Sequence, residues 1–83
     1  MDAQRKQMKL AKRQTNAPFA KRLATYIAKK GLNGYQLAGV LGIQGNTVYC
    51  WLRGDNLPDL VSLGNICKVL DVTPNDLMVG IFL

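Results

Sequence analysis

Residues 34–53, GYQLAGVLGIQGNTVYCWLR, constrain the fold of this 83-residue chain more than any other stretch. They contain two short helical patterns, residues 34–41 and 45–53, separated by a break that has glycine at both ends. The second pattern has a polar face, as expected of a helix that packs on one side and contacts a partner with the other. Small and apolar residues occupy the positions where two crossing helices would touch: Leu37, Ala38, Leu41, Ile43, Val48, Trp51 and Leu52. We therefore predict a helix-turn-helix unit at the centre of the chain.

A longer helix is expected before this unit. It should begin near Pro18, with Asn16 or Ala17 as its cap, because proline suits the first turn of a helix. Gly31 is expected to end it in a left-handed conformation. Its buried stripe follows the helical period at Phe19, Leu23, Tyr26 and Ile27.

Two more helices are expected after the unit. Asp59 is a good cap for a helix over residues 60–70, and Thr73-Pro74-Asn75-Asp76 is a strong start for a short helix over residues 74–79. Within the central pair, Asn33 is a good cap for the first helix and Gln44 a weaker cap for the second. The helix over residues 60–70 is expected to bury Leu60, Leu63, Ile66, Cys67 and Leu70.

No segment shows the alternation of a strand, and no long internal repeat occurs. We predict an all-α fold, a compact five-helix domain over residues 17–83. Residues 1–16 form a basic N-terminal arm that is either flexible or partly helical.

The charge is unevenly distributed. The chain has 11 Lys and Arg residues against 5 acidic residues, a formal net charge of +6. Residues 1–16 contribute +4 of this charge and residues 17–83 contribute +2. A basic protein with a basic arm favours a polyanionic partner, most simply nucleic acid, although a solvated charge cluster without a role has the same composition. The basic residues of the arm are Arg5, Lys6, Lys9, Lys12 and Arg13.

The composition argues against catalysis and metal binding. The chain has no His, and its two cysteines, Cys50 and Cys67, have no CxxC partner and no nearby set of ligands. There are no paired carboxylates and no phosphate-binding glycine loop. We expect no enzymatic activity, no metal and no cofactor. A disulfide framework, a signal peptide and a membrane span are also not expected, so a cytoplasmic protein, associated with the nucleoid when bound to DNA, fits best.

The central motif resembles the phage repressor/Cro-type, or xenobiotic-response-element-type, helix-turn-helix family of regulators in bacteria and phages. The resemblance covers about residues 19–79 and implies a lambda-repressor-like fold. Ala38 would let the two helices cross closely, and Gly42 would permit the positive φ of the turn. The residues that carry the resemblance are Leu37, Ala38, Leu41, Gly42, Ile43, Val48, Trp51, Arg53, Gly54 and Pro58, then Leu63, Ile66 and residues 70–73.

The chain departs from the family at two places. The family often opens its second helix with Gln, which bonds a DNA phosphate, whereas this chain has Gly34. The family also often pairs a basic residue late in its first helix with Glu before the Arg-Gly turn. Ile27 and Leu52 occupy those positions here, so we expect a hydrophobic contact in place of the ion pair.

The resemblance implies a transcriptional regulator, with a repressor as the expected type, that binds duplex DNA with its third helix in the major groove. The expected base contacts are Gln44, Gly45, Asn46, Thr47, Tyr49 and Cys50. The expected phosphate contacts are Asn33, Gly34, Tyr35, Arg53 and Asn56. The arm residues Arg5, Lys6, Lys9, Lys12 and Arg13 are expected to add affinity. Alternatives remain open for four of these residues. Asn46 and Thr47 also suit the start of a helix. Cys50 could be a partly buried packing residue, and Arg53 could be a solvated cation at the end of a helix.

We expect a homodimer on two half-sites. Its interface is expected at the apolar C-terminal end, at Leu77, Met78, Ile81, Phe82 and Leu83. The alternatives are that this end folds back to complete the core, or that the chain is a fragment whose missing part dimerises. The rival function is an antitoxin or antirepressor-like module whose main partner is a protein. RNA binding is less favoured, because only Tyr49 offers an exposed aromatic ring for stacking.

Overall fold

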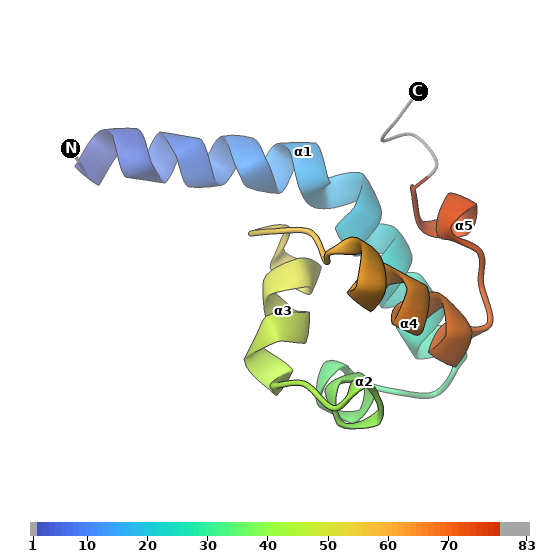
Figure 1. Ribbon diagram of the computed structural model, residues 1–83. Helices are drawn as coiled ribbons and strands as arrows, with labels where there is room; N and C mark the ends of the chain where they lie inside the picture. The colour runs from blue at the N-terminus through green and yellow to red at the C-terminus, as the bar shows by residue number, and fades with distance from the viewer. Residues whose placement is uncertain (1, 79–83) are drawn as a thin grey trace.

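Five α-helices make up the part of the chain that the computed structural model describes, residues 2–78, with side chains described for residue 11 and residues 13–78. The helices are α1 (Asp2–Lys29), α2 (Gly34–Leu41), α3 (Gly45–Arg53), α4 (Leu60–Leu70) and α5 (Pro74–Met78), and the described residues contain no strand. Figure 1 shows α2 to α5 gathered around the C-terminal half of α1. The predicted all-α, five-helix fold is confirmed.

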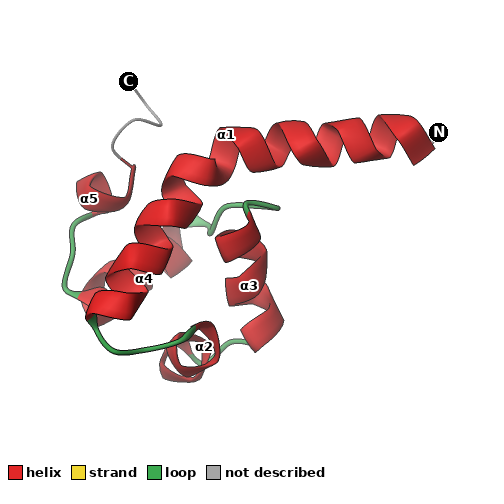
Figure 2. Cartoon of the chain, turned by 180° about the vertical axis from the view of Figure 1, so that it is seen from behind, coloured by secondary structure: helices red, strands yellow, loops and turns green. Residues whose placement is uncertain are grey.

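The first helix is longer than expected. It spans 28 residues and contains Pro18 in its interior, so the predicted start near Pro18 and the predicted cap at Asn16 or Ala17 are wrong. Residues 2–17 are rich in Ala, Gln, Lys and Arg, all good helix formers, and this propensity continues the helix upstream of the proline. Figures 1 and 2 show the N-terminal half of α1 projecting from the domain, and α1 changing direction in its middle, as expected where a helix contains proline.

A single hydrophobic core joins all five helices. The expected stripe of α1 is buried except for Tyr26, which is half-buried beside Lys29. Ile27 is buried in the core, and Leu52 is partly buried and packs against it. These are the two positions at which a hydrophobic contact was expected in place of the family's ion pair. The buried core residues are Phe19, Ala20, Leu23, Ile27, Leu37, Ala38, Val48, Trp51, Leu63, Ile66, Cys67, Leu70 and Leu77.

Two residues lie where they were not expected. Leu60 was expected in the core but is 86% exposed, because it is the first residue of α4 and lies before the stripe that α4 buries. Leu77 was expected at a dimer interface but is fully buried within the chain's own core, which corrects that prediction. The alternative expectation, that this end of the chain folds back to complete the core, therefore holds for Leu77. Ile81, Phe82 and Leu83 lie outside the described residues.

Side-chain caps begin three of the helices. The Asn33 Oδ1 accepts from the Gln36 N–H at 2.8 Å, and the Gln36 Oε1 accepts from the Asn33 N–H at 2.9 Å, a reciprocal capping box. Asp59 caps α4. Thr73 and Asp76 exchange a similar pair of bonds at the start of α5. The predicted caps at Asn33, Asp59 and Thr73 are confirmed.

The turn between α2 and α3 has the expected geometry. Gly42 ends α2 with φ of 72°, in the left-handed region, and the Ile43 N–H donates to the Ala38 carbonyl at 3.0 Å. Ala38 is only 2% exposed. The methyl side chain and the tight turn together allow α3 to cross α2 closely.

Gly54 is constrained twice. It ends α3 with φ of 80°, and a Cβ built on it would lie 3.2 Å from the Arg13 carbonyl oxygen and 3.3 Å from the Arg13 Cα. Both neighbours are backbone atoms of α1, so they cannot move aside as a flexible side chain would. This glycine therefore lets α1 approach the turn after α3.

We expect Gly54→Ala to lower the free energy of unfolding by about 1–3 kcal/mol, because alanine is strained at this φ and its methyl group would press on α1. Gly64→Ala is the matched control. Gly64 lies inside α4 and an added Cβ meets nothing within 4 Å, so this change should raise stability by about 0.5–1 kcal/mol through helix propensity. Urea denaturation measures both values. Equal effects of the two substitutions would contradict the assigned role of Gly54.

Candidate nucleic-acid interface

The helix α3 has one buried face and one exposed polar face. Val48 and Trp51 are buried in the core. Gln44, Asn46 and Thr47 are exposed, and Tyr49 and Cys50 are half-buried. The structure therefore places Gln44, Gly45, Asn46 and Thr47 at the start of α3, with Tyr49 and Cys50 one turn further along. We call this set the recognition surface: Gln44, Gly45, Asn46, Thr47, Tyr49 and Cys50.

Gln44 occupies the cap position of α3, but its side chain makes no capping hydrogen bond. The prediction of a side-chain cap at Gln44 is therefore wrong. A Gln side chain is longer than the Ser, Thr, Asp and Asn side chains that usually reach back to the first turn. The Gln44 amide is left on the exposed surface next to Asn46.

Two tyrosines interlock beside the recognition surface. The rings of Tyr35 and Tyr49 have centroids 4.8 Å apart and are tilted by 58°. The ring of Tyr49, from α3, lies against Gly34 at the start of α2, since a Cβ on Gly34 would be 2.9 Å from the Tyr49 Cζ. The ring of Tyr35, from α2, lies against Gly45 at the start of α3. Sequence reasoning did not find this arrangement, because each ring meets a glycine of the other helix and the pairing depends on how the two helices cross.

Two of the three candidate phosphate contacts at the start of α2, Asn33 and Gly34, already make contacts within the protein. Asn33 is exposed, but its side-chain oxygen caps the helix. Gly34 is buried under Tyr49, whereas Tyr35 is 68% exposed. Of this group, the ring of Tyr35 is thus the most open to a partner. Asn56, in the loop after α3, is exposed.

Asp55 links α1 to α3 through two ion pairs. The Arg13 Nε donates to the Asp55 Oδ1 at 2.6 Å, and the Arg53 Nε donates to the Asp55 Oδ2 at 3.0 Å. Arg53 also donates from Nη2 to the Cys50 Sγ at 3.3 Å. The side chains of Arg13 and Arg53 remain almost half exposed, so each guanidinium is fixed in position but still reaches solvent. The pair Arg13–Asp55 spans 42 positions of sequence, and no local signal predicts it.

Asn16 strengthens the same junction. Its Nδ2 donates to the Gly54 carbonyl at 3.0 Å. The middle of α1 is therefore attached to the turn after α3 by Asn16, Arg13 and the close backbone contact at Gly54. Of the predicted arm residues, Arg13 is placed here, while Arg5, Lys6, Lys9 and Lys12 lie on the projecting half of α1, and their side chains are outside the described ones.

The ion pairs shift the titration of Asp55. The hydrogen bond from Arg13, followed by that from Arg53, lowers the pKa of the Asp55 carboxyl from 3.8 to about 2. The same contact raises the pKa of Arg13. Both groups are therefore charged at neutral pH. The carboxylate also neutralises part of the positive charge that Arg13 and Arg53 bring to this side of the domain.

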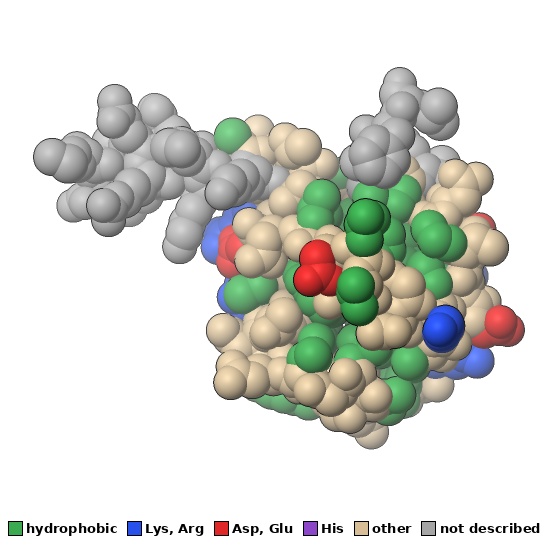
Figure 3. All heavy atoms as spheres, viewed as in Figure 1, with side chains coloured by type: hydrophobic (Ala, Val, Ile, Leu, Met, Phe, Trp, Pro, Cys, Tyr) green, Lys and Arg blue, Asp and Glu red, His purple; other side chains and the backbone are tan. Residues whose placement is uncertain are grey.

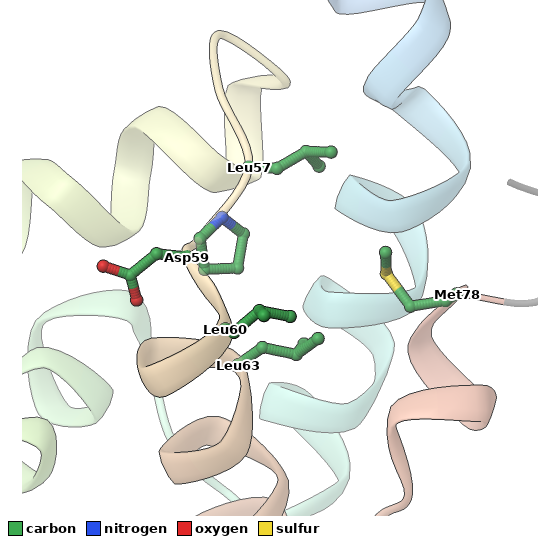
Figure 4. A pocket seen from close by; sticks show the side chains of 6 residues that line it. Leu57, Asp59, Leu60, Leu63 and Met78 are labelled. Atoms are coloured by element: carbon green, nitrogen blue, oxygen red, sulfur yellow. The ribbon is translucent and has the colours of Figure 1, made fainter.

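An apolar groove of about 410 Å³ lies between the loop after α3, the start of α4 and the end of α5. In Figure 4 the side chains of Leu60 and Leu63 lie side by side and point toward the side of the groove on which Met78 lies, while Asp59 points away. Leu57 and Leu60 line this groove and are exposed. Figure 3 shows hydrophobic side chains spread over this face of the molecule. We call Leu57, Leu60 and Met78 the apolar patch.

The described residues contain no cluster of three or more His, Cys, Asp or Glu side chains that could hold a metal ion. Both cysteines are free, and burial raises the pKa of the Cys67 thiol. None of the described helices is both long enough and apolar enough to cross a membrane.

We expect Asp55→Asn to lower stability at pH 6, with a loss that disappears as the pH falls from about 4 to about 2. The folded-state pKa of Asp55 is depressed, so its contribution is present above the ordinary value of 3.8 and is lost as the carboxylate is protonated in the native state. Urea denaturation of both proteins across this pH range measures the difference. Asp71→Asn removes a carboxylate with no ion pair among the described residues and controls for net charge. A loss that is independent of pH would contradict the ion-pair assignment.

Comparisons with known proteins agree with the geometry of α2 and α3. A family model described as the Cro/C1-type HTH DNA-binding domain matches residues 22–82. Searches of the curated proteins and of the solved structures found no significant match. The matched region includes the helix-turn-helix, the recognition surface and the apolar patch. The chain belongs to the Cro/C1-type helix-turn-helix family of DNA-binding domains.

Proposed function

We propose that this protein is a transcriptional regulator that binds a specific duplex DNA sequence by placing α3 in the major groove. The observation that carries this proposal is the division of α3 into a face anchored by Val48 and Trp51 and an exposed polar N-terminal end. We propose repression as the mode of action, because a protein that occupies a promoter can block transcription without any further activity. The proposed location is the cytoplasm, on the nucleoid when DNA is bound.

The base contacts are proposed from side-chain chemistry. Gln44 and Asn46 carry exposed amides that can donate to adenine N7 and accept from its N6 amino group. Thr47 is exposed and can approach a thymine methyl group or a phosphate. The recognition surface contains no Lys or Arg, so A·T base pairs are preferred over guanine at these positions.

The affinity for the phosphate backbone comes from other parts of the domain. Arg53 and Asn56 lie at the end of α3 and in the loop that follows it, and the side chains of both are exposed. The projecting half of α1 carries four of the five arm cations, and as a helix it can lie along the duplex. Contacts of this kind bind any sequence and weaken with salt.

A second copy of the chain is the proposed partner at the apolar patch. One domain of this size covers one half-site, and a twofold dimer would cover two half-sites about one helical turn apart. Met78 belongs to the interface proposed here, and the apolar patch extends that interface to Leu57 and Leu60. The same exposed patch also suits the alternative, an antitoxin or antirepressor-like module that binds another protein.

The proposed function is tested by selection from random duplex DNA, followed by binding measurements on the enriched site. We expect an enriched site with twofold symmetry. Asn46→Ala should weaken binding to that site by about 1–3 kcal/mol and change binding to random DNA little, because a base contact is lost while phosphate contacts remain. No enrichment over scrambled DNA would overturn the DNA-binding proposal and favour a protein partner.

The dimer is tested by sedimentation of a Leu60→Glu variant. Leu60 is 86% exposed at the start of α4, where a negative charge suits the helix dipole, so the monomer fold should be unaffected. We expect the wild type to sediment as a dimer and the variant as a monomer. Val40→Glu adds the same charge at an exposed apolar position of α2 and should remain dimeric. Because a negative charge is unfavourable in the last turn of a helix, the stability of both variants is measured as well. A variant at Leu60 that still dimerises would place the interface elsewhere.

A further inference from the structure

The first residue of α3 has no side chain, and a residue from another helix fills the space. A Cβ built on Gly45 would lie 2.6 Å from the Tyr35 Cε1, closer than real Cβ atoms approach other atoms. Tyr35 belongs to α2, yet its ring occupies the position that a side chain at residue 45 would take. The outer surface at the start of α3 is therefore formed by Tyr35.

Tyr35 is held in this position although it is exposed. Its ring is in contact with Gly45 on one side and packs against Tyr49 at a centroid distance of 4.8 Å. Tyr49 is in turn fixed against Gly34. An aromatic ring that is already fixed loses little conformational freedom when a partner binds it. Tyr35 is thus 68% exposed to solvent while its ring is held in a fixed position.

The neighbours of Tyr35 are the polar side chains proposed to contact bases. Gln44 and Asn46 flank Gly45 directly, and both are exposed. Their amides select adenine through hydrogen bonds, but they give no contact to the methyl group of a thymine. An aromatic ring edge offers the apolar surface that a thymine methyl group needs, and it gives no such contact to cytosine or to uracil.

We propose that Tyr35 is a specificity-determining residue whose ring contacts a thymine methyl group in the operator half-site. This inference rests on the proposed function, DNA recognition by α3. It changes the role of Tyr35 from a phosphate contact, which is independent of sequence, to a base contact. It also assigns part of the specificity to α2.

The test replaces each thymine of the selected duplex with deoxyuridine in turn, which removes only the methyl group. We expect one position in each half-site at which this replacement weakens wild-type binding about fourfold, the effect of burying one methyl-sized group. Tyr35→Ala should bind the thymine and uracil duplexes equally at that position. Tyr35→Phe should keep the discrimination, because the ring and not the hydroxyl makes the contact.

One control and one further variant separate recognition from folding. Val40→Ala truncates another exposed apolar side chain of α2 and should keep the wild-type uracil profile. Gly45→Ala should lose the discrimination while Tyr35 is still present, because the added methyl group displaces the ring. Circular dichroism and thermal unfolding of each variant confirm that the helices are retained.

The outcomes are distinct. A wild-type protein that enriches no duplex overturns the proposed function and this inference with it. A wild-type protein that enriches a duplex whose uracil profile is unchanged in Tyr35→Ala overturns this inference alone. A Tyr35→Ala variant that loses affinity equally for all sequences, with the uracil profile retained, also overturns it and makes Tyr35 a phosphate contact.

Discussion

The attachment of α1 to the turn after α3 fixes the position of α3. Gly54 lets the backbone of α1 come within contact distance, Asn16 donates to its carbonyl, and Asp55 accepts from Arg13. A helix of nine residues cannot hold its own orientation by local bonds alone. The core anchors α3 along its inner face, and this junction anchors its C-terminal end. The N-terminal end is then free to carry exposed polar side chains.

The helices of the central and C-terminal parts could be predicted because their signals are local. Asn33, Asp59 and Thr73 are short polar caps directly before apolar stripes, and the glycines at the ends of α2 and α3 adopt positive φ. The start of α1 could not be predicted in the same way. Pro18 is favoured in the first turn of a helix and costly in its interior, but a bent helix can contain it when its packing compensates, and the local sequence does not show that packing.

The contacts that complete the candidate site are not local. Arg13 and Asp55 are separated by 42 positions, and the tyrosine–glycine interlock depends on the angle at which α3 crosses α2. The residue types on the exposed face of α3 could be predicted from the helical period, whereas the neighbours of those residues could not. Leu60 shows the same limit, because the period that buries Leu63 and Ile66 does not determine whether the first residue of α4 is covered.

The tyrosine interlock joins the N-terminal ends of α2 and α3. In a helix-turn-helix the first helix of the pair is usually a support and the second contacts the bases. Here Tyr35 covers the start of α3 and Tyr49 covers the start of α2, so neither helix presents its N-terminal end independently. A substitution at either glycine would move a ring that belongs to the other helix. The shape of the recognition surface therefore depends on both α2 and α3. The residues of α3 alone do not determine it.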